Sequence, residues 1–265
     1  MRSSGMRAPA NPAASAGPRL VGRARELAAL DRSFELAAAG RAAVVLVAGE
    51  PGIGKTRLLE AFAARAARAG ATLLRGGASD AAGMPPYLPF LEALQRHVES
   101  AAPDLLRAQA GPLAPILATI LPELVARLGE LPSSYPLPAE QARLRLYEAV
   151  GSLLAAVAVE EPLVLLLDDL HWSDPASLEL LCHVVRQQPR SRLLIVGAYR
   201  GGEAEQRPEF ARAVAELNRL RALETVGVGP LPADELAALA QAYLNGPLHP
   251  ATGRLLFEHS EPLRV

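Results

Sequence analysis

The sequence predicts an α/β fold in which a five-stranded parallel sheet is flanked by helices on both faces. Short, continuous apolar runs bounded by turn residues indicate buried parallel strands. Segments with helical periodicity alternate with these runs, and such alternation is typical of right-handed crossovers between parallel strands. A glycine-rich loop lies directly between the first apolar run and the next helical segment. These three observations together define the expected architecture.

Composition supports a folded chain and excludes several classes of protein. Of the 265 residues, 50% are hydrophobic and 21% are charged, so wholesale disorder is excluded. The net charge of −1 provides no electrostatic attraction to nucleic acid or to an anionic membrane. The single cysteine, Cys182, excludes an intrachain disulfide and a multi-cysteine metal cluster. The longest apolar runs are as short as strands, so we expect no membrane span and a cytoplasmic protein.

The expected elements follow the chain in a regular order. Residues 1–19 are rich in Ala, Pro and Ser without a continuous apolar core, which predicts a disordered leader and not a secretory signal. Strands are expected at residues 43–48, 71–76, 163–168, 192–198 and 224–228. Helices are expected at 26–39, 55–69, 139–159, 175–187, 208–220, 232–244 and 248–260, with a loop at 132–138 and several proline-broken short helices between Tyr87 and Leu128. The main domain is expected at 20–230, and a helical subdomain begins at 231 and is still incomplete where the chain ends at Val265.

The loop after the first strand has the pattern G-x-x-x-x-G-K-[ST], which cradles phosphate groups. Its residues are Gly49, Glu50, Pro51, Gly52, Ile53, Gly54, Lys55 and Thr56, followed by Arg57. Glycines let successive backbone N–H groups point at phosphate oxygens, and the following helix N-terminus adds partial positive charge. Lys55 is expected to reach the β- and γ-phosphates of ATP, and the Thr56 hydroxyl is expected to ligate Mg²⁺. The pattern predicts a P-loop NTPase that binds ATP and Mg²⁺ through this segment.

Two further features narrow the interpretation of this loop. Lys55 is the only lysine, and the other 26 of the 27 basic residues are arginines, which indicates that a compact ammonium is needed at this position. A dinucleotide-binding G-x-G-x-x-G pattern is excluded, because Arg57 stands where that pattern needs glycine or alanine. The loop is therefore expected to bind a nucleoside triphosphate.

A second set of candidate residues follows the third expected strand. The apolar run 163–167 ends in Asp168, which places a carboxylate at the carboxyl edge of the sheet, where open α/β folds bind ligands. Asp168 is the expected Mg²⁺ ligand beside Thr56. For Asp169 two roles stay open, since its carboxylate can polarise the attacking water or cap the following turn. Many P-loop ATPases carry the longer glutamate at this position.

The segments after Asp169 and after the fourth strand carry further candidates. Asp174 before Pro175 reads as a helix N-cap with proline at the first helical position. His171 and Trp172 read as a packing pair that can also lie near the phosphates. Arg200 follows the fourth strand and is expected to contact the γ-phosphate, so that it distinguishes ATP from ADP. The alternative for Arg200 is a solvated side chain that starts a Gly-Gly loop.

These motifs together resemble a known group of ATPases. The segment LVGRAREL at residues 20–27 resembles the start of AAA-like and Orc1-like ATPase modules. With the phosphate loop, the acidic strand end and the segments DLHWSDPASLELL and VGAYR, the chain resembles the STAND ATPases over residues 20–262. Within that group it is most similar to the ATPase module of large LuxR-type bacterial transcription regulators. The resemblance implies that Val21, Gly22 and Arg23 cup the adenine, and that ATP binding drives assembly or signalling.

The resemblance also sets the expected function and its alternatives. Residues 259–263 lack the Gly-Asn pair of the family's helical lid, and the chain ends within that lid, so we expect a fragment of a longer protein. Such a module would bind ATP and ADP, associate with itself or a protein partner, and contact DNA only through a domain outside this chain. We expect a slowly hydrolysing nucleotide switch in which Lys55, Asp168, Asp169 and Arg200 act on the phosphates. The alternatives are a stand-alone AAA-like ATPase that acts on a protein partner and an ATP-binding scaffold without turnover.

Overall fold

A five-stranded parallel sheet with the order β2-β3-β4-β1-β5 forms the centre of the structure, a computed structural model that describes residues 20–81, 83–132, 136–204 and 206–244. The strands are β1 (Ala43–Ala48), β2 (Thr72–Gly77), β3 (Leu163–Asp168), β4 (Leu193–Tyr199) and β5 (Leu223–Gly227). Every neighbouring pair is parallel, so the carboxyl ends of all five strands meet at one edge. The predicted α/β fold with five parallel strands is confirmed, and each strand lies within one residue of its expected bounds.

The described residues divide into two units. The larger unit is Arg23–Gly229 and contains the whole sheet. The smaller unit consists of residues 20–22 together with residues 230–244, and it contains α11 (Ala233–Leu244). The expected leader at 1–19, the second helix at 248–260, the segment 259–263 and the middle of the 132–138 loop lie outside the described residues.

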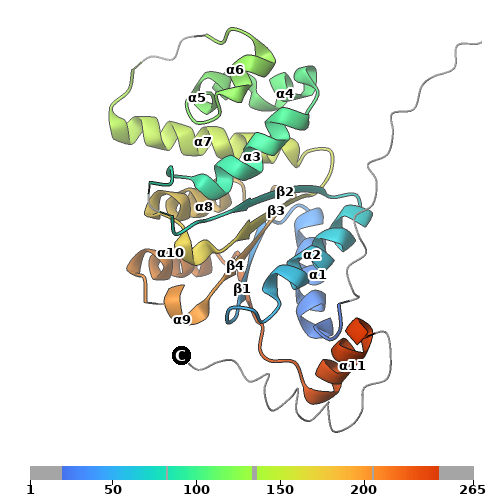
Figure 1. Ribbon diagram of the computed structural model, residues 1–265. Coiled ribbons are helices and arrows are strands. Elements are labelled where there is room, and N and C mark those ends of the chain that lie inside the picture. Colours follow the sequence, from blue (N-terminus) through green and yellow to red (C-terminus); the bar gives the residue numbers. More distant parts are fainter. Residues whose placement is uncertain (1–19, 82, 133–135, 205, 245–265) are drawn as a thin grey trace, which may run out of the picture. The chain divides into compact units, whose positions relative to one another are not determined.

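Helices cover both faces of the sheet in the larger unit (Figure 1). On one face lie α1 (Ala24–Ala38) and α2 (Lys55–Arg68), and on the other lie α3 (Leu88–Ser100), α8 (Pro175–Gln187) and α10 (Pro208–Arg219). Each central strand is therefore covered by apolar side chains of helices on both sides. Consistent with this, the four consecutive residues Val44–Val47 of β1 are each at most 2% exposed. Burial on both sides explains why the central strands read as unbroken apolar runs without a polar alternation.

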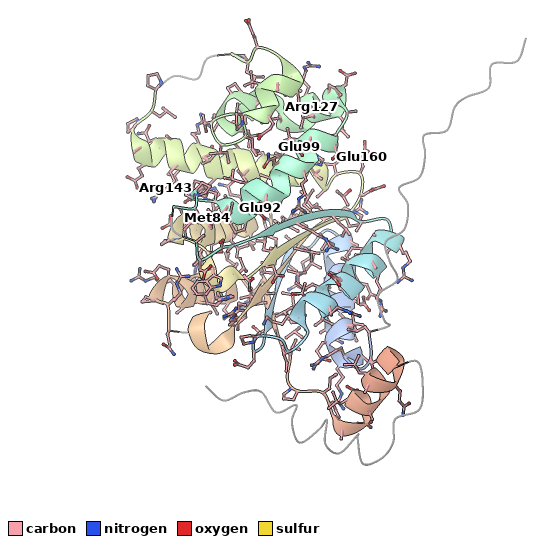
Figure 2. The ribbon with its side chains drawn as sticks, in the orientation of Figure 1. Met84, Glu92, Glu99, Arg127, Arg143 and Glu160 are labelled. Carbon is pink, nitrogen blue, oxygen red and sulfur yellow. The ribbon has the colours of Figure 1, made fainter. Side chains whose placement is uncertain are left out.

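The chain between β2 and β3 builds a further helical layer. It comprises α4 (Pro103–Ala110), η1 (Gly111–Leu113), α5 (Ala114–Leu117), α6 (Glu123–Leu128) and the long α7 (Ala139–Val157). As predicted, the proline-interrupted segment forms several short helices, and α4 and α5 pack on α7, which in turn packs on α8. Polar contacts join α3 to this layer and to the sheet, and Figure 2 labels Arg127 and Glu92, which make two of them. The Arg127 guanidinium donates to the Ala101 carbonyl, and the Glu92 carboxylate accepts from the Gly77 backbone N–H at 3.0 Å.

Two short helices were not predicted. η2 (Leu170–Trp172) follows Asp169, and α9 (Gly201–Ala204) replaces the Gly-Gly loop that the alternative reading of Arg200 assumed. Glycine pairs disfavour helix, but α9 is a single turn closed by a bond from the Ala204 N–H to the Arg200 carbonyl at 3.0 Å, with Ala204 fully buried. No described helix has the length and apolarity that a membrane crossing needs.

Candidate functional site

The glycine-rich loop connects β1 directly to α2 at the carboxyl edge of the sheet. Gly52 and Gly54 have φ angles of 74° and 100°, in the left-handed region that favours glycine. A Cβ atom at either position would have no atom within 4 Å, so the backbone conformation, and not packing, requires glycine there. Because the space beside these glycines is open and the loop leads into the first turn of α2, the N-terminal dipole of α2 can attract an anion here.

Lys55 lies beneath this loop and holds it together. Its ammonium donates to the carbonyls of Gly49 and Glu50 at 2.8 and 3.1 Å, and the residue is only 8% exposed. Burial lowers the pKa of Lys55 below its usual 10.5, the Asp169 and Asp168 carboxylates oppose this shift, and the Arg200 guanidinium adds to it. The same influences show that Asp168, Asp169 and Arg200 all lie within electrostatic reach of the lysine.

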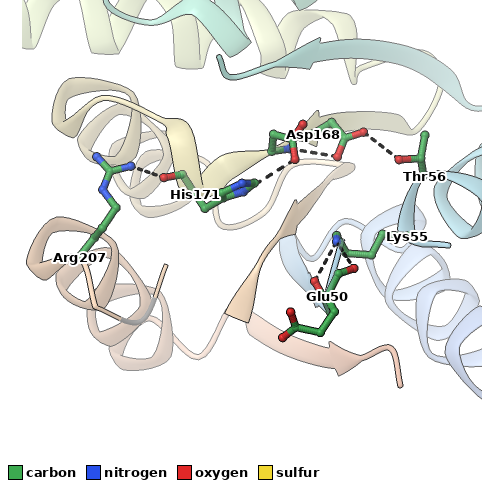
Figure 3. A network of polar contacts seen from close by, with 8 residues as sticks. Glu50, Lys55, Thr56, Asp168, His171 and Arg207 are labelled. Carbon is green, nitrogen blue, oxygen red and sulfur yellow. Dashed lines mark hydrogen bonds and ion pairs between the residues drawn. The ribbon is translucent and has the colours of Figure 1, made fainter. Parts of the chain in front are cut away.

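Thr56 and Asp168 meet although they come from different elements (Figure 3). The Thr56 hydroxyl, in the first turn of α2, donates to Asp168 Oδ2 at the end of β3 over 3.3 Å. Mg²⁺ takes oxygen ligands and is often held by one or two protein oxygens beside phosphate groups. A hydroxyl and a carboxylate that share one position next to the phosphate loop therefore fit this ion. The sequence placed both residues in this role, and the structure brings them together.

Asp169 lies at the N-cap position of η2, directly after the carboxyl end of β3. Its φ of 52° is in the left-handed region, its N–H donates to Asp168 Oδ1 at 3.0 Å, and its side chain is 47% exposed. The Asp169 carboxylate accepts no capping hydrogen bond from the backbone of η2. Its Oδ1 instead lies 3.8 Å from Nδ1 of His171. This geometry leaves the carboxylate accessible to a water molecule at the sheet edge.

Arg200 follows the last residue of β4, and β4 lies between β1 and β3 in the sheet. The residue after β4 consequently emerges between the phosphate loop and Asp168. The Arg200 side chain is half-buried and close enough to Lys55 to lower the pKa of that lysine. Arg200 thus lies at the carboxyl edge of the sheet, near Lys55.

The three residues expected at the adenine divide between the two units. Arg23 belongs to the larger unit, is 7% exposed, and donates to the Ile53 carbonyl of the phosphate loop at 3.2 Å. Val21 and Gly22 belong to the smaller unit, in which a Cβ atom on Gly22 would lie 2.1 Å from the Glu235 carboxylate. Arg23 is therefore attached to the phosphate loop by a direct hydrogen bond.

The other residues of the expected site take up ordinary positions for a loop. Glu50 and Pro51 are exposed at its tip, Ile53 is half-buried, and Arg57 is half-buried in the first turn of α2. Asp174 caps α8 as predicted, since its carboxylate accepts from the Ser177 N–H at 3.0 Å.

The sequence does not predict the contacts of Arg207 at this edge. The Arg207 guanidinium donates to the carbonyls of His171 and Ser173, at 3.0 Å for the second, and so fastens the turn after Asp169. Arg207 lies 36 residues beyond His171 in a chain with many arginines, and no local pattern marks it.

Comparison with known proteins identifies the family. The model of the AAA ATPase domain family matches residues 19–196. An uncharacterized protein of Rhizobium meliloti (strain 1021) is 29% identical over 203 residues, which are 72% of this chain and 19% of that protein. The hybrid signal transduction histidine kinase G of Dictyostelium discoideum is 29% identical over 175 residues, 61% of this chain and 5% of that protein. The chain therefore spans no more than about a fifth of the curated relatives it matches.

Solved structures share the fold at low sequence identity. Cdc6p from Pyrobaculum aerophilum has a TM-score of 0.51 and 13% identity, over 89% of this chain and 53% of that chain. The replication initiator DnaA, solved with AMPPCP and single-stranded DNA, has a TM-score of 0.50 and 14% identity, over 94% of this chain and 60% of that chain. The family match covers about two thirds of the sequence and includes the phosphate loop and the acidic end of β3. The chain belongs to the AAA ATPase domain family.

Proposed function

We propose that this AAA ATPase domain binds ATP with Mg²⁺ and acts as a slowly hydrolysing nucleotide switch. One observation carries the proposal: the Thr56 hydroxyl and the Asp168 carboxylate are 3.3 Å apart beside a glycine loop that the buried Lys55 braces. A phosphate-binding loop, a lysine and an oxygen pair for a divalent cation are the parts that P-loop nucleotide sites use. In support, DnaA, which has the same fold, was solved with an ATP analogue bound.

Each residue has a defined part in the proposed site. The loop N–H groups and Lys55 hold the β- and γ-phosphates, and Lys55 exchanges its present carbonyl partners in part for phosphate oxygens. Thr56 and Asp168 hold Mg²⁺, which when bound neutralises charge on the phosphates. Asp169 orients the attacking water, and Arg200 contacts the γ-phosphate. Arg23, which is bonded to the phosphate loop, contacts the adenine.

Slow turnover is proposed because of the acid that follows Asp168. Phosphoryl transfer depends on positioning and charge stabilisation, so a misplaced base is costly. Asp169 is one methylene shorter than the glutamate that many P-loop ATPases carry, and its side chain is 47% exposed to bulk water. Both features favour a site that binds ATP and hydrolyses it slowly.

We further propose that the switch belongs to a signalling or transcription regulator of the LuxR type. The sequence segments DLHWSDPASLELL and VGAYR support this, as does the similarity to a hybrid signal transduction histidine kinase, of which the matched part is only 5%. A small ATPase module within a much longer regulatory protein is the arrangement that the proposal requires. A stand-alone ATPase working on a protein partner would instead need rapid turnover.

The experiment measures ATP affinity by titration calorimetry and steady-state phosphate release on the same protein. Lys55→Ala removes the ammonium and should abolish measurable ATP binding, whereas Arg68→Ala removes a positive charge from the last turn of the same helix and should leave binding intact. Wild-type turnover should lie well below the ~10 s⁻¹ typical of enzymes. Equal ATP affinities for wild type and Lys55→Ala would overturn the site, and turnover of ~10 s⁻¹ or more would overturn the switch.

A further inference from the structure

The turn that follows Asp169 is largely buried, unlike an ordinary surface turn. It comprises residues 170–173, of which Leu170, His171 and Ser173 are at most 2% exposed. Leu170 packs on β4 so closely that a Cβ atom on Gly197 would lie 2.1 Å from its Cδ1. The turn is therefore seated on the strand that separates the phosphate loop from Asp168, and Gly197 makes room for it.

Arg207 binds the backbone of this turn by two hydrogen bonds, a contact that we call the Arg207 clamp. Its guanidinium spans two backbone carbonyls, those of His171 and Ser173, and Figure 3 shows the first of these contacts. A planar guanidinium remains charged at all relevant pH values and can bind two acceptors at once, which a lysine cannot do in one plane. Arg207 lies just beyond α9, the single turn that begins after Arg200. Only one helical turn of chain therefore separates Arg200 from the residues that lead to Arg207.

His171 lies in the turn with its ring beside the Asp169 carboxylate. Its side chain is fully buried, its Nδ1 lies 3.8 Å from Asp169 Oδ1, and its ring packs at 5.0 Å from the ring of Trp172. Asp169 itself is held in a left-handed conformation by its N–H bond to Asp168 Oδ1. Asp168 therefore fixes the backbone of Asp169, and the buried His171 ring lies beside the Asp169 carboxylate.

We propose that His171 and Arg207 are positioning residues for ATP hydrolysis, which hold the Asp169 carboxylate where it orients water and connect it to Arg200 through α9. This inference rests on the proposed function, because it assigns a task to Asp169 in that reaction. A purely structural packing pair would affect stability alone. A positioning pair affects turnover at unchanged ATP affinity, and it makes the turn respond to bound nucleotide.

The experiment uses variants that keep the bulk of each side chain. His171→Leu keeps the buried volume but loses Nδ1, and should lower turnover by about 10–100-fold, the cost of a small misplacement in a site. ATP affinity should change by no more than about twofold, as for sites that do not interact directly. His171→Asn restores a nitrogen near the position of Nδ1 and should recover part of the turnover. Arg207→Lys should have the lowered turnover of a variant without the guanidinium, because an ammonium does not bridge both carbonyls as a planar guanidinium does.

Trp172, the only tryptophan, supplies a readout that does not depend on turnover. Its fluorescence should change when ATP is added to the wild type, and this change should be lost in Arg207→Ala although calorimetry still shows ATP binding. Two matched controls should behave as wild type in both assays. His183→Leu replaces another buried histidine, and Arg192→Ala removes a guanidinium that also spans two carbonyls, those of Val159 and Glu160.

A double-mutant cycle gives the decisive result. In an Asp169→Asn background His171→Leu should cause no further loss of turnover, because the residue it positions no longer acts. Equal losses in both backgrounds, or unchanged turnover in folded His171→Leu and Arg207→Ala, would overturn the inference while wild-type ATP binding and slow turnover still supported the proposed function. Absence of ATP binding by the wild type would instead refute the proposed function itself.

Discussion

Gly76 in β2 should be hard to replace, because the first turn of α3 lies very close to it. A Cβ atom at this position would lie 1.8 Å from the Pro89 carbonyl oxygen, 2.8 Å from its carbon and 3.2 Å from the Ala93 nitrogen. All three are backbone atoms of α3, which cannot rotate away as the end of a side chain can. The change Gly76→Ala must therefore push the whole first turn of α3 off the strand.

The size of the effect follows from this geometry. Moving the oxygen from 1.8 Å to at least 3.0 Å from the new methyl requires a shift of about 1.2 Å. Overpacking a core costs typically 1–3 kcal/mol, and a shift of backbone against backbone belongs at the upper end, about 3 kcal/mol. For a domain of this size that corresponds to a fall in Tm of roughly 6–12 °C.

Thermal unfolding followed by circular dichroism tests this value, and the neighbouring glycine supplies the control. A Cβ atom on Gly77 would lie 3.9 Å from the Asp168 carbonyl oxygen and 4.0 Å from the Glu92 carboxylate, which is ordinary contact. Gly77→Ala should therefore unfold close to the wild type. If Gly76→Ala and Gly77→Ala melt within about 2 °C of each other, below the shift expected for 1 kcal/mol, the close approach of α3 to β2 is wrong.

Three further predictions concern charged groups. Asp168→Asn should weaken ATP binding about 10–100-fold with Mg²⁺ present and much less in EDTA, as expected for loss of one charged contact, and calorimetry showing equal losses would contradict the metal role. Arg200→Ala should reduce the preference for ATP over ADP about tenfold, whereas an unchanged ratio of affinities would remove Arg200 from the γ-phosphate. Burial lowers the pKa of His183 below 6.5, Arg186 adds to this shift, and Glu148 opposes it. The folded chain therefore binds fewer protons than the unfolded chain just below pH 6.5, so stability should fall with decreasing pH there, by up to about 1.4 kcal/mol per pH unit. Urea unfolding of His183→Gln should show a smaller pH dependence than the wild type.

The strands were predictable because their pattern has a single physical cause. A parallel strand buried on both faces has no polar alternation, so β1 and β3 appear as unbroken apolar runs whose ends coincide with turn residues. The start of α8 was predictable for a different reason, since Asp174 before Pro175 is a typical helix N-cap pattern. The phosphate loop was predictable because its glycines are required by the local backbone conformation, namely the left-handed φ of Gly52 and Gly54.

The contacts around the turn after Asp169 could not be predicted in this way. η2 and α9 are single turns, and segments of three or four residues carry no usable periodicity. The clamp by Arg207 depends on backbone carbonyls as acceptors, and every residue offers a carbonyl, so no residue type identifies its partner. His171 looked like a packing residue, and it does pack on Trp172. Its distance to Asp169 follows from the left-handed backbone conformation of Asp169, which the sequence does not show.

Strand order explains why the predicted residues converge at one edge. Thr56 and Asp168 are 112 residues apart and follow β1 and β3, two strands that are not neighbours. Because β4 separates them, the residue that follows β4 must emerge between them, and that residue is Arg200. An order in which β4 did not lie beside β1 would keep the motifs intact and move Arg200 away from Lys55. Sequence motifs therefore supply the chemical groups of the proposed site, whereas the position of β4 decides whether Arg200 and the turn behind it can act on the same phosphates.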